Sequence, residues 1–177
     1  MVSLVNINSS ENWLAFLCGL LTVEMVLLFT FRKFPRFWGD TINEWYDKFG
    51  IIAISLDVII VLIGFWIAQW LYKTLFGNEK FQLWKFIGIF LIVQIIHDFL
   101  FYFIIIRTSK GNNAILDLML NYGNKHGALT VVGDSLMVVL AIVMTYLYLN
   151  ANMDFGTYIL ILLLSLYLIG FLLYQKW

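Results

Sequence analysis

Four carboxylates lie inside apolar runs of this chain, where an ionised side chain is costly. Glu24, Asp57, Asp98 and Asp134 occupy four separate runs, and His97 directly precedes Asp98. An acid near the middle of a membrane span costs about 2.5 to 3.5 kcal/mol on insertion scales, so we expect these side chains to face inward. Carboxylates and an imidazole can relay protons or bind a cation. The sequence therefore predicts an ion or proton site made of these five residues.

Each of the four acids lies eight or nine residues from a basic residue at one end of its run. These basic residues are Arg32, Lys48, Arg107 and Lys125. At 1.5 Å per helical residue, the acids should lie at one depth, roughly 12 to 14 Å from a basic rim. No Lys or Arg lies at that depth. Converging carboxylates without counter-charge cannot all stay ionised, so the site must take up protons, bind a cation or open to water.

Three further polar residues share the helical faces of two of the acids. Gln94 and Tyr102 lie four residues on either side of Asp98, and Thr130 lies four residues before Asp134. Residues four apart lie on the same face of a helix. We therefore predict that these side chains support the site.

A divalent metal ion is one expected occupant of the site. The predicted ligands are Asp57, His97, Asp98 and Asp134. Carboxylates combined with an imidazole suit Zn, Mn or Fe. No HExxH motif accompanies them, and Cys18 is the only cysteine, which excludes a thiolate cluster within the chain. A proton relay without metal is the other expectation.

Composition and run length identify the elements that hold these residues. The chain is 62% hydrophobic and 12% charged, with a mean hydropathy of +0.89, well outside the range of soluble domains. Five apolar runs, each about 20 residues, are long enough to cross a bilayer, where only helices satisfy their own backbone groups. We predict an all-α polytopic protein, with residues 1–177 as one integral membrane domain. The runs are 13–31, 50–72, 85–106, 128–149 and 155–175.

The first four runs form two similar halves. Lys48, Gly50 and Asp57 in the first half are matched in spacing by Lys125, Gly127 and Asp134 in the second. Because both halves begin on the same side, the pattern predicts a 2+2 repeat about a pseudo-twofold axis along the membrane normal, with four helices forming an acid-lined bundle. Two unrelated hairpins are the alternative. The fifth run has no ionisable residue in its core, so we expect a peripheral helix that faces lipid or a second copy of the chain.

Two connections have helical patterns of their own. Thr41 and Glu44 have the spacing of a capping box and predict a short helix before the second run. Ile115, Leu118 and Tyr122 have the spacing of an amphipathic helix in the membrane interface. That second helix either closes the loop or acts as a gate.

Basic residues predict the orientation of the chain. Eight of the eleven lie in the connection after run one, in the connection after run three or at the end of the chain, and three lie on the other side. The positive-inside rule then places the N-terminus outside and the C-terminus in the cytosol.

The sequence leaves three functions open. One is a channel or transporter for a cation or protons, another is a structural or assembly protein, and the last is a membrane-embedded metal-dependent enzyme, for which no nucleophile motif is present. There is no nucleotide-binding loop and net charge is zero, so we expect no nucleic-acid partner. The segments "QIIHDFLFYF" and "GDSLM", with the five-span layout, resemble uncharacterised membrane proteins of large DNA viruses that infect algae. This resemblance implies a virion or host-membrane component.

Overall fold

The computed structural model describes residues 3–38 and 40–175, and this part of the chain contains helices and no strand. Five helices are long and apolar enough to cross a membrane, which confirms the predicted all-α polytopic fold. They are α1 (Ser10–Lys33), α4 (Ile51–Phe76), α5 (Leu83–Arg107), α7 (Ala128–Asn150) and α8 (Phe155–Tyr174). Three shorter helices are α2 (Pro35–Trp38), α3 (Asp40–Phe49) and α6 (Ala114–His126).

Local sequence signals set several helix boundaries. Pro35 begins α2, because proline is tolerated in a first turn but cannot continue a helix. Ser9 caps α1 and Asn113 caps α6 through side chains that accept backbone N–H groups. Asp154 caps α8 by accepting from the N–H of Thr157 at 2.8 Å and from its hydroxyl at 3.0 Å. These hydrogen bonds lower the pKa of Asp154 below its usual value.

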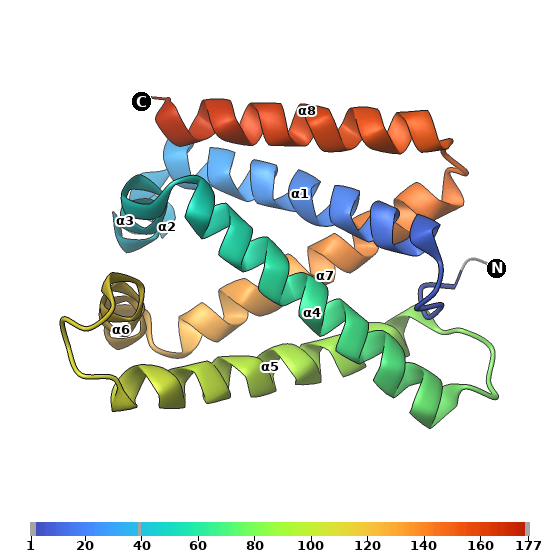
Figure 1. Ribbon diagram of the computed structural model, residues 1–177, viewed down its shortest axis with the longest axis horizontal. Helices are drawn as coiled ribbons and strands as arrows, with labels where there is room; N and C mark the ends of the chain where they lie inside the picture. Colours follow the sequence, from blue (N-terminus) through green and yellow to red (C-terminus); the bar gives the residue numbers. More distant parts are fainter. Residues whose placement is uncertain (1–2, 39, 176–177) are drawn as a thin grey trace.

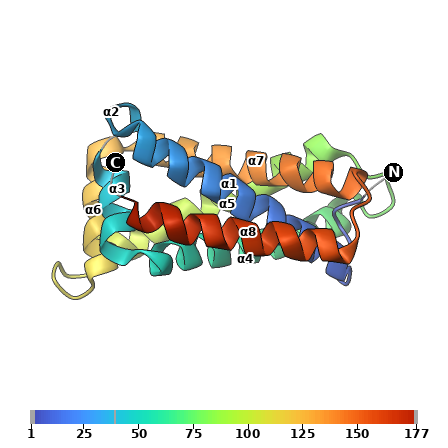
Figure 2. The ribbon, with the colours of Figure 1, turned by 90° about the horizontal axis from the view of Figure 1, so that it is seen from above.

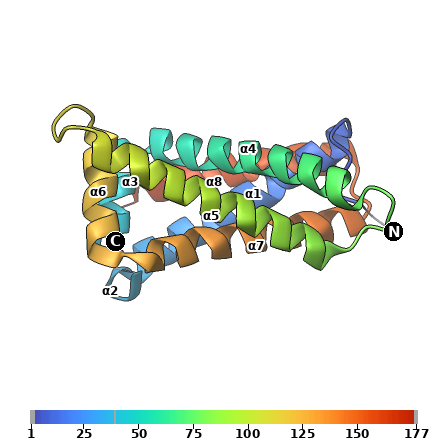
Figure 3. The ribbon, with the colours of Figure 1, turned by 90° about the horizontal axis from the view of Figure 1, so that it is seen from below.

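The five long helices run along the length of the molecule, and the two termini lie at opposite ends (Figure 1). Helices α3 and α6 lie across the ends of the long helices, at the end where the chain finishes (Figures 2 and 3). Arg32, Lys48, Arg107 and Lys125 all lie in last turns at this end. We call it the cation-rich end, and the other the opposite end.

The placement of the helices can be compared with the predicted repeat, which itself stays a prediction. In Figure 1, α4 crosses in front and α7 crosses behind in the other diagonal, with α1 above and α5 below. A half-turn about the long axis therefore exchanges α1 with α5, α3 with α6 and α4 with α7. Gly50 before α4 and Gly127 before α7 have nearly the same backbone angles, φ 52° and ψ −125° against φ 55° and ψ −130°. Positive φ is accessible to glycine without steric cost.

Two glycines let the long helices approach closely. A Cβ atom on Gly19 of α1 would lie 2.8 Å from the hydroxyl of Thr145 and 3.1 Å from the carbonyl oxygen of Ala141, both on α7. A Cβ atom on Gly64 of α4 would lie 2.8 Å from the ring of Phe90 on α5. Close approach at small residues is a usual source of packing energy between helices in lipid. Both glycines belong to the first half of the bundle, and each faces a helix of the second half.

Helix α8 packs along α1, as expected of a peripheral fifth span (Figures 1 and 2). The Cys18 thiol donates to the carbonyl oxygen of Tyr158, with 3.2 Å between sulfur and oxygen. At the cation-rich end, the Arg32 guanidinium donates to the carbonyl oxygen of Leu173 at 3.1 Å and to Asp47 Oδ1 at 2.5 Å. Arg32 therefore joins α1, α3 and α8. From the sequence, this residue was only a marker of orientation.

Candidate functional site

The acids of the first half, Glu24 and Asp57, are covered by aromatic side chains of α3. Glu24 on α1 is 1% exposed, and the hydroxyl of Tyr46 donates to its Oε1 at 2.9 Å. Asp57 on α4 is half-buried, and the indole N–H of Trp45 donates to its Oδ2 at 3.1 Å. Burial, followed by the negative charge of Glu24, raises the pKa of Tyr46 well above its usual value, so its hydroxyl keeps its proton. Both acids of this half therefore have a stable hydrogen-bond donor.

The acids of the second half, Asp98 and Asp134, are less completely bonded. Asp98 Oδ1 on α5 accepts from the Gln94 amide at 2.8 Å and lies 3.2 Å from His97 Nδ1. Its other oxygen, Oδ2, is buried and has no hydrogen-bond partner among the described residues. Asp134 on α7 is exposed, and its side chain makes no hydrogen bond to any of the residues that the structure describes. This half can accept a proton or a cation without first breaking an existing bond.

The four acids are close enough for their charges to interact. Asp134 interacts with Asp98, Asp57 and His97, and Glu24 interacts with Asp57 and Asp134. The structure thus brings the five residues of the predicted ion or proton site into one region of the bundle, toward the cation-rich end. We call Glu24, Asp57, His97, Asp98 and Asp134 the acid cluster.

The two short helices cover the acid cluster unequally. Trp45 lies twelve residues before Asp57, and Tyr122 lies twelve residues before Asp134, so the repeat places an aromatic donor at the same register in both halves. Trp45 is bonded to its acid, whereas Tyr122 has no hydrogen bond in the described structure and its ring lies 4.9 Å from that of His126. Leu129, Val132 and Leu136 at the start of α7 are exposed. Side chains of α3 therefore cover the acids of the first half, whereas Asp134 and the start of α7 are left exposed.

Contact between α3 and α6 holds the two covers together. Thr41 Oγ1 on α3 lies 3.4 Å from His126 Nε2 on α6. Helix α3 begins at Asp40, so Thr41 lies inside the helix and the predicted capping role is wrong. The helix begins two residues earlier than the capping-box pattern indicates, and the Thr41 hydroxyl lies beside His126 of α6.

Tyr122 offers a titration that reports its distance from the acids. Burial, followed by the charges of Asp134 and Asp57, raises its pKa to about 12, whereas an unfolded tyrosine ionises near about 10. The folded state thus favours the neutral phenol. This contribution to stability is complete below pH 10 and is lost as the pH rises through about 12. We expect the difference in phenolate absorbance between wild type and Tyr122→Phe to show one group titrating near pH 12; a midpoint near 10 would contradict this placement.

Two predicted supporting residues do not join the acid cluster. Tyr102 is 49% exposed and contacts the ring of Phe103 on its own helix. The hydroxyl of Thr130 donates to the carbonyl oxygen of Gly127 at 2.9 Å, within the first turn of α7. Helical spacing placed both on the right faces, but α5 is largely exposed beyond Asp98 and the Thr130 hydroxyl is used by local backbone. Gln94, the third supporting residue, does contact Asp98.

The predicted metal ligands are not gathered into a coordination sphere. Among the described residues, no group of three His, Cys, Asp or Glu side chains is placed to hold a metal ion. Of Asp57, His97, Asp98 and Asp134, only the adjacent pair on α5 is within hydrogen-bond distance, and Asp57 is bonded to Trp45 instead. A divalent metal at the cluster stays a prediction, which elemental analysis of the purified protein can test.

Sequence reasoning missed the two residues that cover the first half. Tryptophan and tyrosine next to a membrane span are typical of the headgroup region, so residue type alone did not link Trp45 and Tyr46 to the acids. Both are buried, however, and both donate to acids inside the bundle. A usable signal was the interval of about three helical turns from Trp45 to Asp57, interrupted by Gly50, which lets α3 fold back over the end of the bundle.

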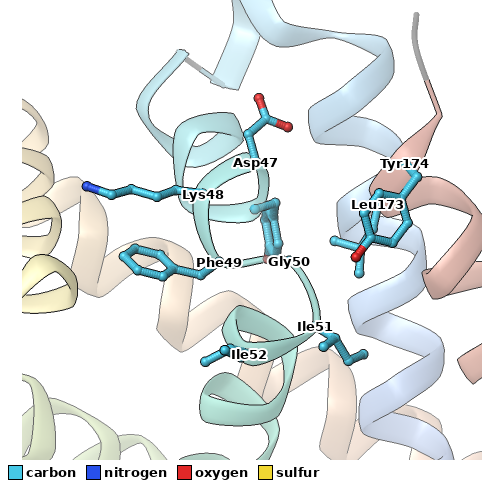
Figure 4. A pocket seen from close by; sticks show the side chains of 9 residues that line it. Asp47, Lys48, Phe49, Gly50, Ile51, Ile52, Leu173 and Tyr174 are labelled. Atoms are coloured by element: carbon cyan, nitrogen blue, oxygen red, sulfur yellow. The ribbon is translucent and has the colours of Figure 1, made fainter.

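A cavity of about 360 Å³ lies beside this cover, between the α3–α4 junction and the end of α8 (Figure 4). Asp47 to Ile52 line one side, and Leu173 and Tyr174 line the other. Tyr46 also lines the cavity while its hydroxyl bonds Glu24. One side chain therefore separates this cavity from the buried acid.

No family model, curated protein or solved structure matches this chain.

Proposed function

We propose that this membrane protein transports protons, which it binds at the acid cluster. One observation carries the proposal: four spans each contribute one carboxylate to a region in which their charges interact. No Lys or Arg of the sequence lies at that depth in the spans. Such a group of acids is stable in a low dielectric only if it shares protons or binds a cation. Protons fit better than a metal ion because Glu24, Asp57 and Asp98 are bonded to aromatic, amide and imidazole groups. Among the described residues, the acids do not converge on a common point where a metal ion could be held.

The second half of the cluster is the part that would exchange protons. Asp98 has one oxygen without a partner among the described residues, His97 lies beside it, and the exposed Asp134 interacts with the charges of both. A histidine can change charge near neutral pH, so it can pass protons between water and the carboxylates. Glu24 and Asp57, held by Tyr46 and Trp45, would instead keep the cluster in place. The positive-inside rule assigns the cation-rich end to the cytosol.

Proton movement in liposomes tests the proposal. Purified protein is reconstituted into vesicles that contain a pH-sensitive dye, and a potassium diffusion potential drives protons. We expect the vesicle interior to change pH faster with wild type than with the Asp57→Asn, Asp134→Asn double variant or with empty vesicles. Equal rates for correctly folded wild type and double variant would overturn the proposal.

A structural role is the second candidate, and one observation favours it. Glu24 accepts a hydrogen bond from the hydroxyl of Tyr46, whose pKa is raised, and Asp57 accepts one from the indole of Trp45, which does not titrate. Such bonds are typical of a neutral polar core between helices. A protein of this kind would show no proton flux in the same vesicles, and its variants would lose stability alone.

A further inference from the structure

A layer of large apolar side chains lies on the far side of the acid cluster from the cation-rich end. Each of the four spans has a fully buried residue eight positions from its acid, in the direction of the opposite end. These residues are Phe16, Phe65, Phe90 and Ile142, each 0% exposed. At 1.5 Å per residue, the layer lies roughly 12 Å from the acids. We call these four residues the apolar layer.

The apolar layer is tightly packed. The rings of Phe16 and Phe65 stack with centroids 3.8 Å apart and planes 5° from parallel. Phe90 lies 6.0 Å from Phe16 and 6.3 Å from Phe65, measured between ring centroids. Ile142 belongs to the same contiguous core. Water and ions would have to separate these side chains in order to pass, and apolar constrictions of this kind exclude water.

The N-terminal segment adds to the closure at the opposite end. Leu4 is fully buried, and its carbonyl oxygen accepts from the Gln69 amide at 2.6 Å. The Asn12 amide donates to the carbonyl oxygen of Ser3 at 2.9 Å, and the Trp13 indole donates to that of Ile7 at 2.8 Å. Residues 3–7 are thereby bonded to α1 and α4 on the far side of the layer.

We infer that the apolar layer is a barrier that restricts access to the acid cluster to the cation-rich end. The contrast between the two sides carries this inference: toward the cation-rich end Asp134 and the start of α7 are exposed, whereas toward the opposite end the four layer residues are fully buried. This inference rests on the proposed function and adds to it. The acids load protons from one side, and transport across the membrane requires the layer to open.

One-sided chemical labelling tests the barrier without measuring transport. In a Cys18→Ala background, Asp134→Cys supplies a single thiol at the exposed position of the cluster. A membrane-impermeant methanethiosulfonate reagent is added to one side of oriented vesicles. We expect labelling from the cation-rich end and slower labelling, by about tenfold or more, from the opposite end.

Substitutions in the layer should remove this difference. Phe65→Ala in the same background should raise the labelling rate from the opposite end by about tenfold. Trp66→Ala is the matched control, because Trp66 is the next residue on α4 but is 50% exposed and faces away from the layer. If Phe65→Ala does not give a folded protein, Phe65→Leu and Ile142→Ala make smaller openings at the same level and should raise the rate by a smaller factor.

The outcomes separate this inference from the proposed function. Rapid labelling of the intact background from the opposite end would overturn the barrier, as would unchanged labelling in all folded layer variants. One-sided labelling with no proton flux in liposomes would leave the barrier in place and refute proton transport. Proton flux together with rapid labelling from both sides would support proton transport and refute the barrier.

Discussion

Asp98→Asn should lower potential-driven proton flux in proteoliposomes by about a hundredfold, the lower range for loss of a proton-transfer group. Asp98 is the acid with a buried, unpartnered oxygen, and it contacts both Gln94 and His97. Asparagine keeps the shape and can still bond its neighbours, but it does not take up a proton near neutral pH. The measurement is the initial rate of pH change inside vesicles at a fixed diffusion potential, normalised to the amount of incorporated protein.

Asp117→Asn is the matched control for this prediction. Asp117 is also an aspartate near the cation-rich end, but it lies on α6 and accepts from the backbone N–H of Gly111 at 3.0 and 3.2 Å, outside the acid cluster. Its replacement should leave the flux close to that of wild type. An Asp98→Asn protein that is folded and retains full flux would show that the second half of the cluster does not carry protons.

Gly19→Ala should destabilise the bundle by about 1 to 3 kcal/mol, the usual cost of overpacking a close contact. The added methyl group would lie 2.8 Å from the Thr145 hydroxyl and 3.0 Å from the Thr145 backbone nitrogen. Because one of these atoms is backbone, α1 and α7 have to move apart. Thermal unfolding of the detergent-solubilised protein, followed by circular dichroism, measures the loss.

The control for Gly19 is Gly170→Ala on α8. A Cβ atom there would meet no atom within 4 Å, so the substitution adds no overlap. Alanine also favours a helix over glycine by about 0.5 to 1 kcal/mol, which predicts equal or slightly greater stability. If Gly19→Ala and Gly170→Ala behave alike, the close approach of α1 to α7 is not a source of stability.

Much of the fold follows from the length of apolar runs, and part of the site follows from simple spacing. Run length gave five spans, and the constant interval from acid to basic residue placed Glu24, Asp57, Asp98 and Asp134 at one level. The prediction of five spans succeeds because a span is forced to be helical, and the fixed rise per residue is what underlies the predicted common level of the acids. Gly50 and Gly127, which occupy corresponding positions in the two halves, have nearly the same backbone angles, as two equivalent turns into a span would.

The partners of the acids could not be predicted in the same way. The bonds from Tyr46 to Glu24 and from Trp45 to Asp57 depend on how α3 folds back over the bundle, which no periodicity encodes. Periodicity also placed Tyr102 on the same helical face as Asp98. It does not show that most side chains of α5 after Asp98 are exposed, Tyr102 among them. The burial of Arg32 against α8 similarly depends on a helix that lies 141 residues away from it in the chain.

The packing of α1 affects how the bundle assembles while the chain is being synthesised. This helix packs mainly against α7 and α8, and its bonds from Thr22 to Tyr148 and from Cys18 to Tyr158 join residues 126 and 140 positions apart. During synthesis α1 enters the membrane before α4 and α5, whereas its main neighbours α7 and α8 leave the ribosome after them. Glu24 therefore enters the bilayer before α7 and α8, the helices that pack against α1 in the folded protein. Such long-range pairing makes assembly slow, and the bundle closes only after α7 and α8 have been inserted.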